Sequence, residues 1–417
     1  MSTPLTMARA NSALKVLFPQ KRVAEMDWES LPFYNWVPND TGFYGRSCEL
    51  PVRVGPHGGA SNTFAPAQSM KGSSNYVHFL MTRVKKYIFA SFDNEALEAS
   101  ERDNGAYMAL KEGEIEGCFQ GIKQQTAADF CGNGSGRIAT VSNVTGDVLT
   151  VGEGDIVNFQ IDQRIQSFAV NAAAAVATSA GPKGWMTVGA IDADNNKITL
   201  NTTDGDTAAL DGVDSTTDKY IAIYGSVGNA LSGTQAWVPG GTPAERTTTL
   251  STTFKNVARS TFTSRLGGVY YDGSATGSIA EALEKAVARG KKEGSNPEVA
   301  WMNHGRVQDL SLDLGSRAVR EPYKIGNFAY SSISFSSGSK MIKVIGDPHF
   351  ADNDCLIATK ASWRFHTLKA APRLMGKQGN SDMILEPAAD GWEVRIGWYG
   401  ELECLSPIDN IRVVLPT

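Results

Sequence analysis

The chain has 417 residues, of which 41% are hydrophobic and 20% are charged, and its formal net charge is −5. This composition supports a hydrophobic core and excludes a chain that is disordered throughout. The negative net charge argues against a protein whose whole surface binds nucleic acid. The sequence contains no apolar run of about 18 residues, so it predicts no membrane-spanning helix. Its N-terminus lacks the basic-then-apolar order of a secretory signal.

The first 48 residues are rich in aromatic side chains and have little periodicity. The aromatic residues are Trp28, Phe33, Tyr34, Trp36, Phe43 and Tyr44. Residues 1–92 also contain 10 Lys and Arg against 5 Asp and Glu. Exposed aromatic clusters usually mark contact sites, so we expect an arm that docks either on its own domain or on a neighbouring chain.

Residues 49–92 predict a long hairpin. Residues 49–54 alternate as a strand, residues 55–75 are rich in Gly, Pro, Ser and Asn, and residues 76–92 are rich in aromatic and β-branched side chains. A strand of about 15 residues extends about 50 Å, and an isolated two-stranded ribbon is marginal in water. We therefore expect a neighbouring subunit to cover the ribbon. The alternative is a shorter strand with an ordinary surface loop.

A long helix is predicted from Asn94 to about Phe130, with Asp93 as its N-cap. Three glycines four residues apart lie on one side of it: Gly113, Gly117 and Gly121. Such a row lets another backbone pack closely, although each glycine costs about 1 kcal/mol relative to alanine. A kinked or interrupted helix is the alternative. The glycine-rich residues 131–136 end the helix.

The segment 136–246 differs from the rest in charge and composition. It contains 6 Lys and Arg against 12 Asp and Glu, and the remainder of the chain has a net charge of +1. Residues 141–151 predict a strand, a Gly-Asp turn and a second strand, and residues 188–200 repeat this plan. We predict a small, barrel-like β-domain inserted into a host domain.

After this segment, helices and strands mix without a regular βαβ order, which predicts an α+β fold. Residues 278–292 form an amphipathic helical pattern, with Ser278 and Glu281 as a capping box. A short helix is predicted at 305–314. Strands are predicted at residues 298–303, 332–335, 341–345, 355–368, 392–400 and 411–415.

The usual catalytic signatures are absent from the sequence: it has no P-loop, no G-x-S-x-G, no H-E-x-x-H and no C-x-x-C. The best remaining constellation is Asp347, His349 and Asp352, which could bind a metal or act in acid–base chemistry. A turn between two strands is the preferred interpretation. We expect no enzymatic activity, no cofactor and no metal.

The order of these elements resembles that of the major capsid proteins of tailed bacteriophages, the Hong Kong 97-type fold. Four segments resemble that family locally: residues 79–97, 298–314, 345–349 and 392–416. The resemblance implies an N-terminal arm (1–48), an extended loop (49–92), a spine helix of the peripheral domain (93–130), the inserted domain (136–246), and the axial domain with the rest of the peripheral domain (247–417).

The resemblance also implies a structural role. Copies would assemble into hexamers and pentamers of an icosahedral shell around double-stranded DNA, located in the virion and in the host cytoplasm during assembly. The implied inter-subunit contacts are Phe64, Met70, Lys71, Trp28 and Trp36. The residues that could face DNA non-specifically are Arg83, Lys85 and Lys86.

The expected partners are portal, scaffolding and decoration proteins, and no membrane. Many family members begin with a scaffolding segment that is cut away. Because the sequence starts at Met1, we expect a separate scaffold or none.

Two alternatives remain open at the sequence level. One is another virion or encapsulating shell protein, such as a cargo-holding compartment. The other is a hydrolase or carbohydrate-binding protein that uses the inserted β-domain. It would require the Asp347, His349 and Asp352 constellation to share a pocket with Trp185 or Trp237.

Overall fold

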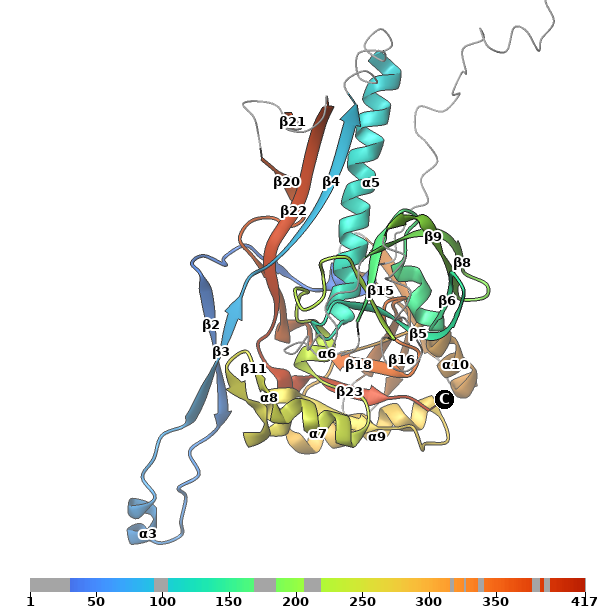
Figure 1. Cartoon of the computed structure of the whole chain (residues 1–417). Helices are drawn as coiled ribbons and strands as arrows, with labels where there is room; N and C mark the ends of the chain where they lie inside the picture. Colours follow the sequence, from blue (N-terminus) through green and yellow to red (C-terminus); the bar gives the residue numbers. More distant parts are fainter. Residues whose placement is uncertain are drawn as a thin grey trace, which may run out of the picture.

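The computed structural model describes residues 31–93, 104–168, 185–205, 219–315, 319–325, 328–336, 341–376, 383–385 and 391–416. Within these residues the chain forms two mixed β-sheets, a closed β-barrel, two separate strand pairs and the helices that pack on them (Figure 1). The fold class is α+β, as the sequence predicts. None of the helices in these ranges is long and apolar enough to cross a membrane.

A seven-stranded sheet has the order β13-β23-β18-β14-β17-β16-β15. The pairs β13–β23 and β14–β17 are parallel and the others are antiparallel. The bounds are β13 Val269–Asp272, β14 Val299–Met302, β15 Val319–Ile325, β16 Phe328–Ser336, β17 Met341–Gly346, β18 Asp354–Ala358 and β23 Ile411–Val414.

Two helices pack on this sheet: α9 (Ile279–Glu293) and α10 (His304–Leu314). The apolar stripe of α9 is buried in the same core cluster as strands β18 and β23. The Ser278 hydroxyl accepts a hydrogen bond from Glu281 N at 3.3 Å, so the predicted helix start is confirmed. The amphipathic pattern therefore located this element correctly.

A six-stranded sheet is built around the long strand β22, which pairs with β19, β20, β21 and β4, while β1 pairs with β19. The bounds are β1 Asn39–Asp40, β4 Val84–Asp93, β19 Trp363–Thr367, β20 Arg373–Met375, β21 Ile384–Leu385 and β22 Gly391–Cys404. The prediction of one strand over 355–368 is wrong. The 3₁₀ turn Lys360–Ser362 separates β18 from β19, and the two strands belong to different sheets.

Helix α5 (Asn104–Cys131) is continuous and packs on β4 and β22 (Figure 1). The predicted long helix is therefore confirmed over residues 104–131, and the alternative of an interrupted helix is wrong for these residues. A Cβ at Gly121 would lie 3.5 Å from Cδ1 of Ile88, so this glycine lies against β4. Asp93 is the last residue of β4, and the predicted start of the helix at residues 94–103 lies outside the described residues.

The single long strand predicted over 76–92 is wrong. It is divided at Arg83 into β3 (Asn75–Thr82), which pairs with β2 (Ser47–Gly55), and β4, which pairs with β22. Arg83 lies between the two strands, and its Nη1 donates a hydrogen bond to the Phe43 carbonyl at 3.0 Å. Both halves have strand-forming sequences, but they extend different sheets.

Six strands close into a barrel in the order β10-β5-β6-β9-β8-β7. Its elements are β5 Arg137–Thr145, β6 Val148–Val151, the 3₁₀ helix Glu153–Asn158, β7 Arg164–Phe168, β8 Met186–Asp192, β9 Lys197–Gly205 and β10 Tyr220–Ile223. Both predicted hairpins are confirmed, with Gly146 (φ 59°) and Asn196 (φ 54°) in the turns. These residues adopt the left-handed conformation that such turns require.

The last strand of the barrel ends at Ile223, and Tyr224 and Gly225 still donate hydrogen bonds to β7. Residues 228–246 of the expected insert belong to the main body. Trp237 is fully buried there and donates a hydrogen bond to the Leu402 carbonyl at 2.9 Å. The remaining elements of this region are α6 Thr234–Trp237, α7 Pro243–Ser251, β11 Thr253–Phe254, β12 Val257–Ala258, the 3₁₀ helix Arg259–Thr261, α8 Thr263–Gly267 and, near the C-terminus, the 3₁₀ helix Pro407–Asp409.

The described part of the N-terminal arm docks on its own chain. Helix α2 (Pro32–Trp36) buries Phe33 and Trp36, each 1% exposed. The Phe33 ring lies 5.4 Å from Trp301 and 5.6 Å from Phe350, both edge-on. The expectation that Trp36 contacts a neighbouring subunit is therefore wrong, because its side chain is in this chain's own core. Trp28 lies outside the described residues.

Candidate functional site

The hairpin of β2 and β3 is anchored on one side only. Alternate side chains face the body of the molecule and are buried: Leu50, Val52, Val54, Phe79 and Met81. The Phe79 ring lies 5.1 Å from Trp237 and 6.3 Å from Phe254, both close to edge-on. The base of the hairpin is thus stabilised by the chain's own core rather than by a partner.

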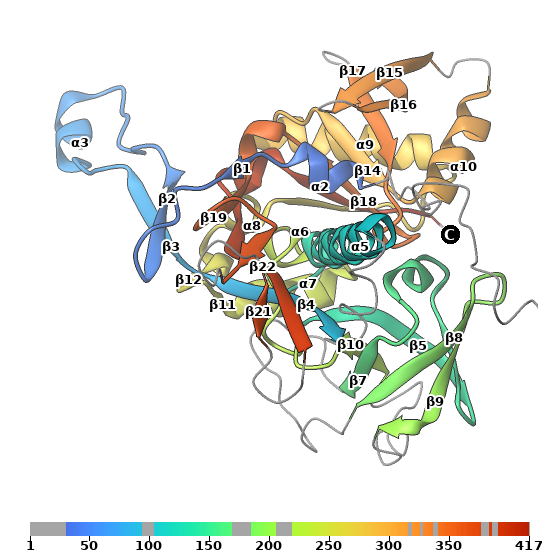
Figure 2. The ribbon, with the colours of Figure 1, turned by 90° about the horizontal axis from the view of Figure 1, so that it is seen from above.

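The tip of the hairpin, residues 56–74 with α3 (Phe64–Ser69), projects away from the rest of the chain (Figures 1 and 2). No residue of α3 is buried, Phe64 is 81% exposed, and Met70 is 43% exposed. Lys71 is also exposed. Large apolar side chains at the end of a projecting element contribute little to this chain's own core, so the tip is a candidate contact surface.

The His57 ring lies between the two legs of this tip. Its nitrogens lie 3.1 Å from Gly59 N and 3.0 Å from Gly72 N. A neutral imidazole accepts one of these two hydrogen bonds. The contacts hold the legs together without involving the main body.

A second exposed apolar surface lies on the sheet face opposite α5. Tyr87 and Phe89 of β4 are 46% and 55% exposed, and their rings stack at 6.5 Å. The Tyr399 ring of β22 lies 5.9 Å from Tyr87, and the Arg395 guanidinium lies 6.0 Å from Phe89. Side chains alternate along a strand, so Ile88 faces α5 while these aromatic rings face outward.

The three basic residues expected to face DNA have different surroundings. Arg83 is held by the Phe43 carbonyl, with its guanidinium 5.3 Å from the Phe43 ring. Lys86 Nζ donates to Asp129 Oδ2 at 2.6 Å and to the Gln125 carbonyl at 3.0 Å, which ties β4 to α5. Lys85 is exposed. Of the three, Lys85 is therefore the one with an exposed side chain.

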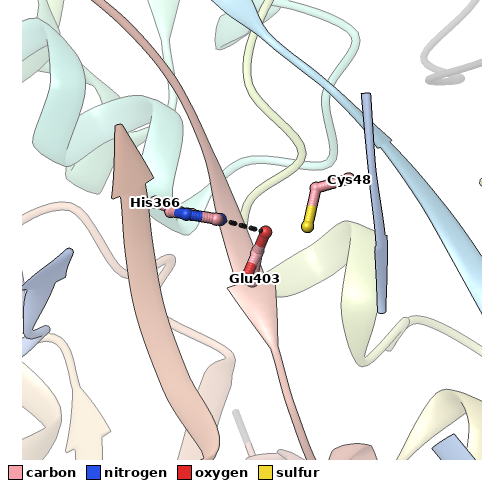
Figure 3. A group of neighbouring side chains, drawn as sticks. All are labelled: Cys48, His366 and Glu403. Atoms are coloured by element: carbon pink, nitrogen blue, oxygen red, sulfur yellow. Dashed lines mark hydrogen bonds and ion pairs between the residues drawn. The ribbon is translucent and has the colours of Figure 1, made fainter. Parts of the chain in front are cut away.

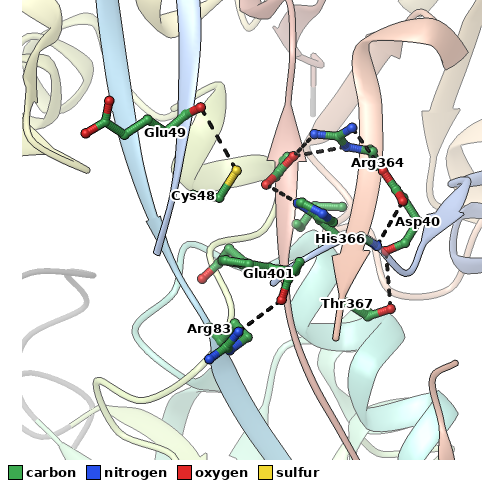
Figure 4. A network of polar contacts seen from close by, with 12 residues as sticks. Asp40, Cys48, Glu49, Arg83, Arg364, His366, Thr367 and Glu401 are labelled. Carbon is green, nitrogen blue, oxygen red and sulfur yellow. Dashed lines mark hydrogen bonds and ion pairs between the residues drawn. The ribbon is translucent and has the colours of Figure 1, made fainter. Parts of the chain in front are cut away.

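A polar junction joins the arm to the six-stranded sheet (Figure 4). Arg364 donates to Asp40 Oδ2 and to Glu403 Oε2, each at 3.0 Å. Nδ1 of His366 lies 2.8 Å from Glu403 Oε1, and the Phe43 ring stacks on His366 at 4.8 Å. These contacts fix the direction in which the chain leaves the sheet and enters the hairpin at Ser47.

Sequence analysis missed this junction. Its one signal is a pair of basic residues, Arg364 and His366, in register with Glu403 and Glu401 on the adjacent strand. That register is a tertiary feature, since β19 and β22 are separated by two other strands in the chain. The charges alone did not predict it.

The residues considered for hydrolysis do not form a reactive group. The buried Asp347 carboxylate accepts hydrogen bonds from Phe33 N at 3.0 Å and His349 N at 2.9 Å, so it holds α2 and its own turn. His349 Nδ1 lies 2.9 Å from Asn158 Oδ1, and burial lowers its pKa. Trp237 is in the main core, and Trp185 lies on the barrel under the Arg164 guanidinium at 4.0 Å.

No family model and no curated protein matches this sequence. The capsid asymmetric unit of Cyanophage A-1(L) matches 98% of this chain and 99% of that chain, with 11% identity and a TM-score of 0.54. The chain has the Hong Kong 97-type fold. The capsid of a native GTA particle is also similar: the match covers 99% of this chain and 98% of that chain, with 9% identity and a TM-score of 0.48. The holo-SrpI encapsulin complex from Synechococcus elongatus matches 99% of this chain and 96% of that chain, with 7% identity and a TM-score of 0.45.

The parts of the Hong Kong 97-type fold correspond to the elements described above. The β2–β3 hairpin lies in the segment expected to be the extended loop, and α5 lies in the segment expected to be the spine helix. The six-stranded sheet packs on α5, and the seven-stranded sheet packs on α9 and α10; we interpret these two layers as the expected peripheral and axial domains. The barrel is the additional, inserted part, and it lies beside α5 and the axial domain (Figures 1 and 2).

Proposed function

We propose that this chain is a structural capsid protein with no catalytic role. Its copies form the hexamers and pentamers of an icosahedral shell that encloses double-stranded DNA. The observation that carries the proposal is the exposed tip of the extended loop on a Hong Kong 97-type fold. The protein is located in the virion, after assembly in the host cytoplasm.

The tip of the extended loop supplies the contact between subunits. Phe64 and Met70 gain burial only when another surface covers them, and Lys71 lies beside them. Burying one large apolar side chain stabilises by about 1.5–3 kcal/mol, and the repetition of this contact by symmetry multiplies it over a closed ring. Portal, scaffolding and decoration proteins complete the set of partners.

Charge supports the placement of DNA. The barrel lies within the acidic segment, so it faces away from DNA or braces neighbouring subunits. The rest of the chain has a net charge of +1 and can line the interior. Lys85 is the side chain we assign to non-specific contact with phosphate. The purified particle tests this directly: encapsulated DNA supports the proposal, and an empty or enzyme-filled particle supports a cargo-holding shell.

Phe64→Asp is the experiment that tests the assembly contact. The variant is expected to remain folded, because Phe64 is 81% exposed, but to stop shell formation. Size-exclusion chromatography with light scattering, followed by negative-stain microscopy, measures both. Wild type should give shells, or rings of five and six subunits.

Ile161→Asp is the matched control. Ile161 is 63% exposed on the barrel, so the same charge is introduced at an apolar surface position away from the extended loop. Normal shells from Phe64→Asp, or a wild-type chain that stays monomeric with scaffold and high salt, would contradict the proposal.

A further inference from the structure

Three side chains with metal-binding atoms meet at the base of the extended loop (Figure 3). Cys48 comes from β2, His366 from β19 and Glu403 from β22. One ligand atom of each lies within 4.8 Å of the other two. His366 is 5% exposed and Glu403 is fully buried, while Cys48 is half-buried. The group is thus closed on the sheet side and accessible on the thiol side.

We propose that Cys48, His366 and Glu403 bind a divalent transition-metal ion of the zinc type. Sulfur, imidazole nitrogen and carboxylate oxygen together are the ligands that Zn²⁺ prefers over Mg²⁺ or Ca²⁺. Ligand distances of about 2.0–2.3 Å require only small movements from the present spacing. The metal takes the place of the proton between His366 and Glu403, and water completes a tetrahedral site.

The surrounding residues already orient these ligands. Arg364 donates to Glu403 Oε2 at 3.0 Å, which leaves Oε1 directed at the site. The Phe43 ring stacks on the imidazole of His366 and fixes its plane. Residues that orient the metal ligands in this way strongly affect the metal affinity of a site.

The local charges also favour a bound cation. With a neutral imidazole, Arg364 faces the two carboxylates of Asp40 and Glu403, which leaves one negative charge. A divalent cation together with a thiolate at Cys48 brings this total to zero. A bound metal stabilises the Cys48 thiolate.

The proposed site joins the extended loop to the peripheral sheet. Cys48 belongs to the first strand of the loop, whereas the other two ligands belong to the sheet. A bound metal therefore ties the base of the loop to the body of the same subunit. This inference does not depend on shell assembly. No pattern in the sequence predicts this site, because the three ligands are far apart in the chain and match no metal-binding spacing.

Cobalt(II) titration of the purified full-length chain tests the site. Co²⁺ bound to a thiolate gives a sulfur-to-cobalt charge-transfer band in the near ultraviolet, and we expect this band to saturate at one Co²⁺ per chain. Zn²⁺ should displace the cobalt and Mg²⁺ should not. Cys48→Ser should abolish the band. It should also weaken Zn²⁺ binding by at least about 10-fold, since even the loss of a residue that only orients a ligand has an effect of that size.

Cys118→Ser is the matched control, since Cys118 is the other half-buried thiol and lies on α5. It should keep the band unchanged. Far-ultraviolet circular dichroism confirms that both variants are folded, and Cys48→Ala provides a second removal of the ligand. The absence of the band in wild type, or its persistence in folded Cys48→Ser and Cys48→Ala, overturns the proposal.

Discussion

Charged side chains are buried where the six-stranded sheet meets the strand pair β11–β12. Lys255 Nζ lies 3.3 Å from Glu401 Oε2, and the two side chains are 10% and 1% exposed. Glu401 Oε1 also accepts a hydrogen bond from Ser232 N at 2.8 Å. Burial raises the pKa of Glu401, and the Lys255 charge opposes this shift. The carboxylate is therefore held in place by one cation and by the backbone amides of Ser232 and Leu402.

Lys255→Met should destabilise the chain by about 3 kcal/mol, because removing one partner leaves a buried charge without its counter-charge. When folding raises the pKa of a carboxyl, the free energy of unfolding falls as the pH rises above the ordinary pKa of that group, because the folded state then has to hold a buried charge. The loss in free energy of unfolding caused by Lys255→Met should therefore be larger near pH 8 than near pH 5. Urea unfolding at both pH values measures it.

Glu401→Gln added to Lys255→Met should restore much of the loss, since the double variant has no buried charge at this position. Lys285→Met is the surface control. Lys285 pairs with Glu281 on α9, and both side chains are about half exposed, so its unfolding midpoint should stay close to that of wild type. A pH-independent deficit in Lys255→Met would contradict this account.

The barrel is the element with the clearest boundary. Gly228 N donates to the Ser135 carbonyl at 2.9 Å, and a Cβ at Gly136 would lie only 2.4 Å from the Ser226 carbonyl. The two ends of the barrel therefore leave the main body side by side. The barrel also has its own core, separate from those of the two sheets.

Replacing residues 137–225 by a short Gly-Ser linker should leave a folded main body, because the linker joins ends that are already in contact. Deleting 136–246 should not, since it also removes Trp237 and α6 from the main core. Thermal unfolding and circular dichroism of the two deletions distinguish them. Loss of folding in both would show that the barrel is required for the host domain.

At the scale of the whole molecule, the proposed function assigns subunit stability and shell assembly to different parts of the β2–β3 hairpin. The inner halves of β2 and β3 pack on the chain's own core, whereas the tip packs on nothing described. Deleting residues 59–72 should therefore leave the thermal midpoint of the subunit close to wild type and abolish shell formation. Calorimetry and negative-stain microscopy of the same sample measure these two effects. A lower midpoint would mean that the tip stabilises its own subunit.

Local patterns in the sequence predicted several elements correctly. The apolar stripe and Ser278 cap located α9, the turn residues Gly146 and Asn196 located the barrel hairpins, and the Gly-rich stretch with Phe64 located the projecting tip. Each of these depends on neighbours within one element. A helix period, a turn conformation or a polar stretch with one exposed aromatic residue can be recognised without knowing what packs against it.

The tertiary structure alone decided where strands change partners and which side chains meet. The breaks at Arg83 and at residues 360–362 lie within strand-like sequence, and the same pattern fits either sheet. An aromatic residue such as Trp36 suits a contact with a neighbouring subunit as well as a place in the chain's own core, and only the tertiary structure shows that it lies in the core. Cys48, His366 and Glu403 meet because three strands come together. Periodicity specifies an element, whereas long-range pairing and packing, which act between residues far apart in the chain, specify its neighbours.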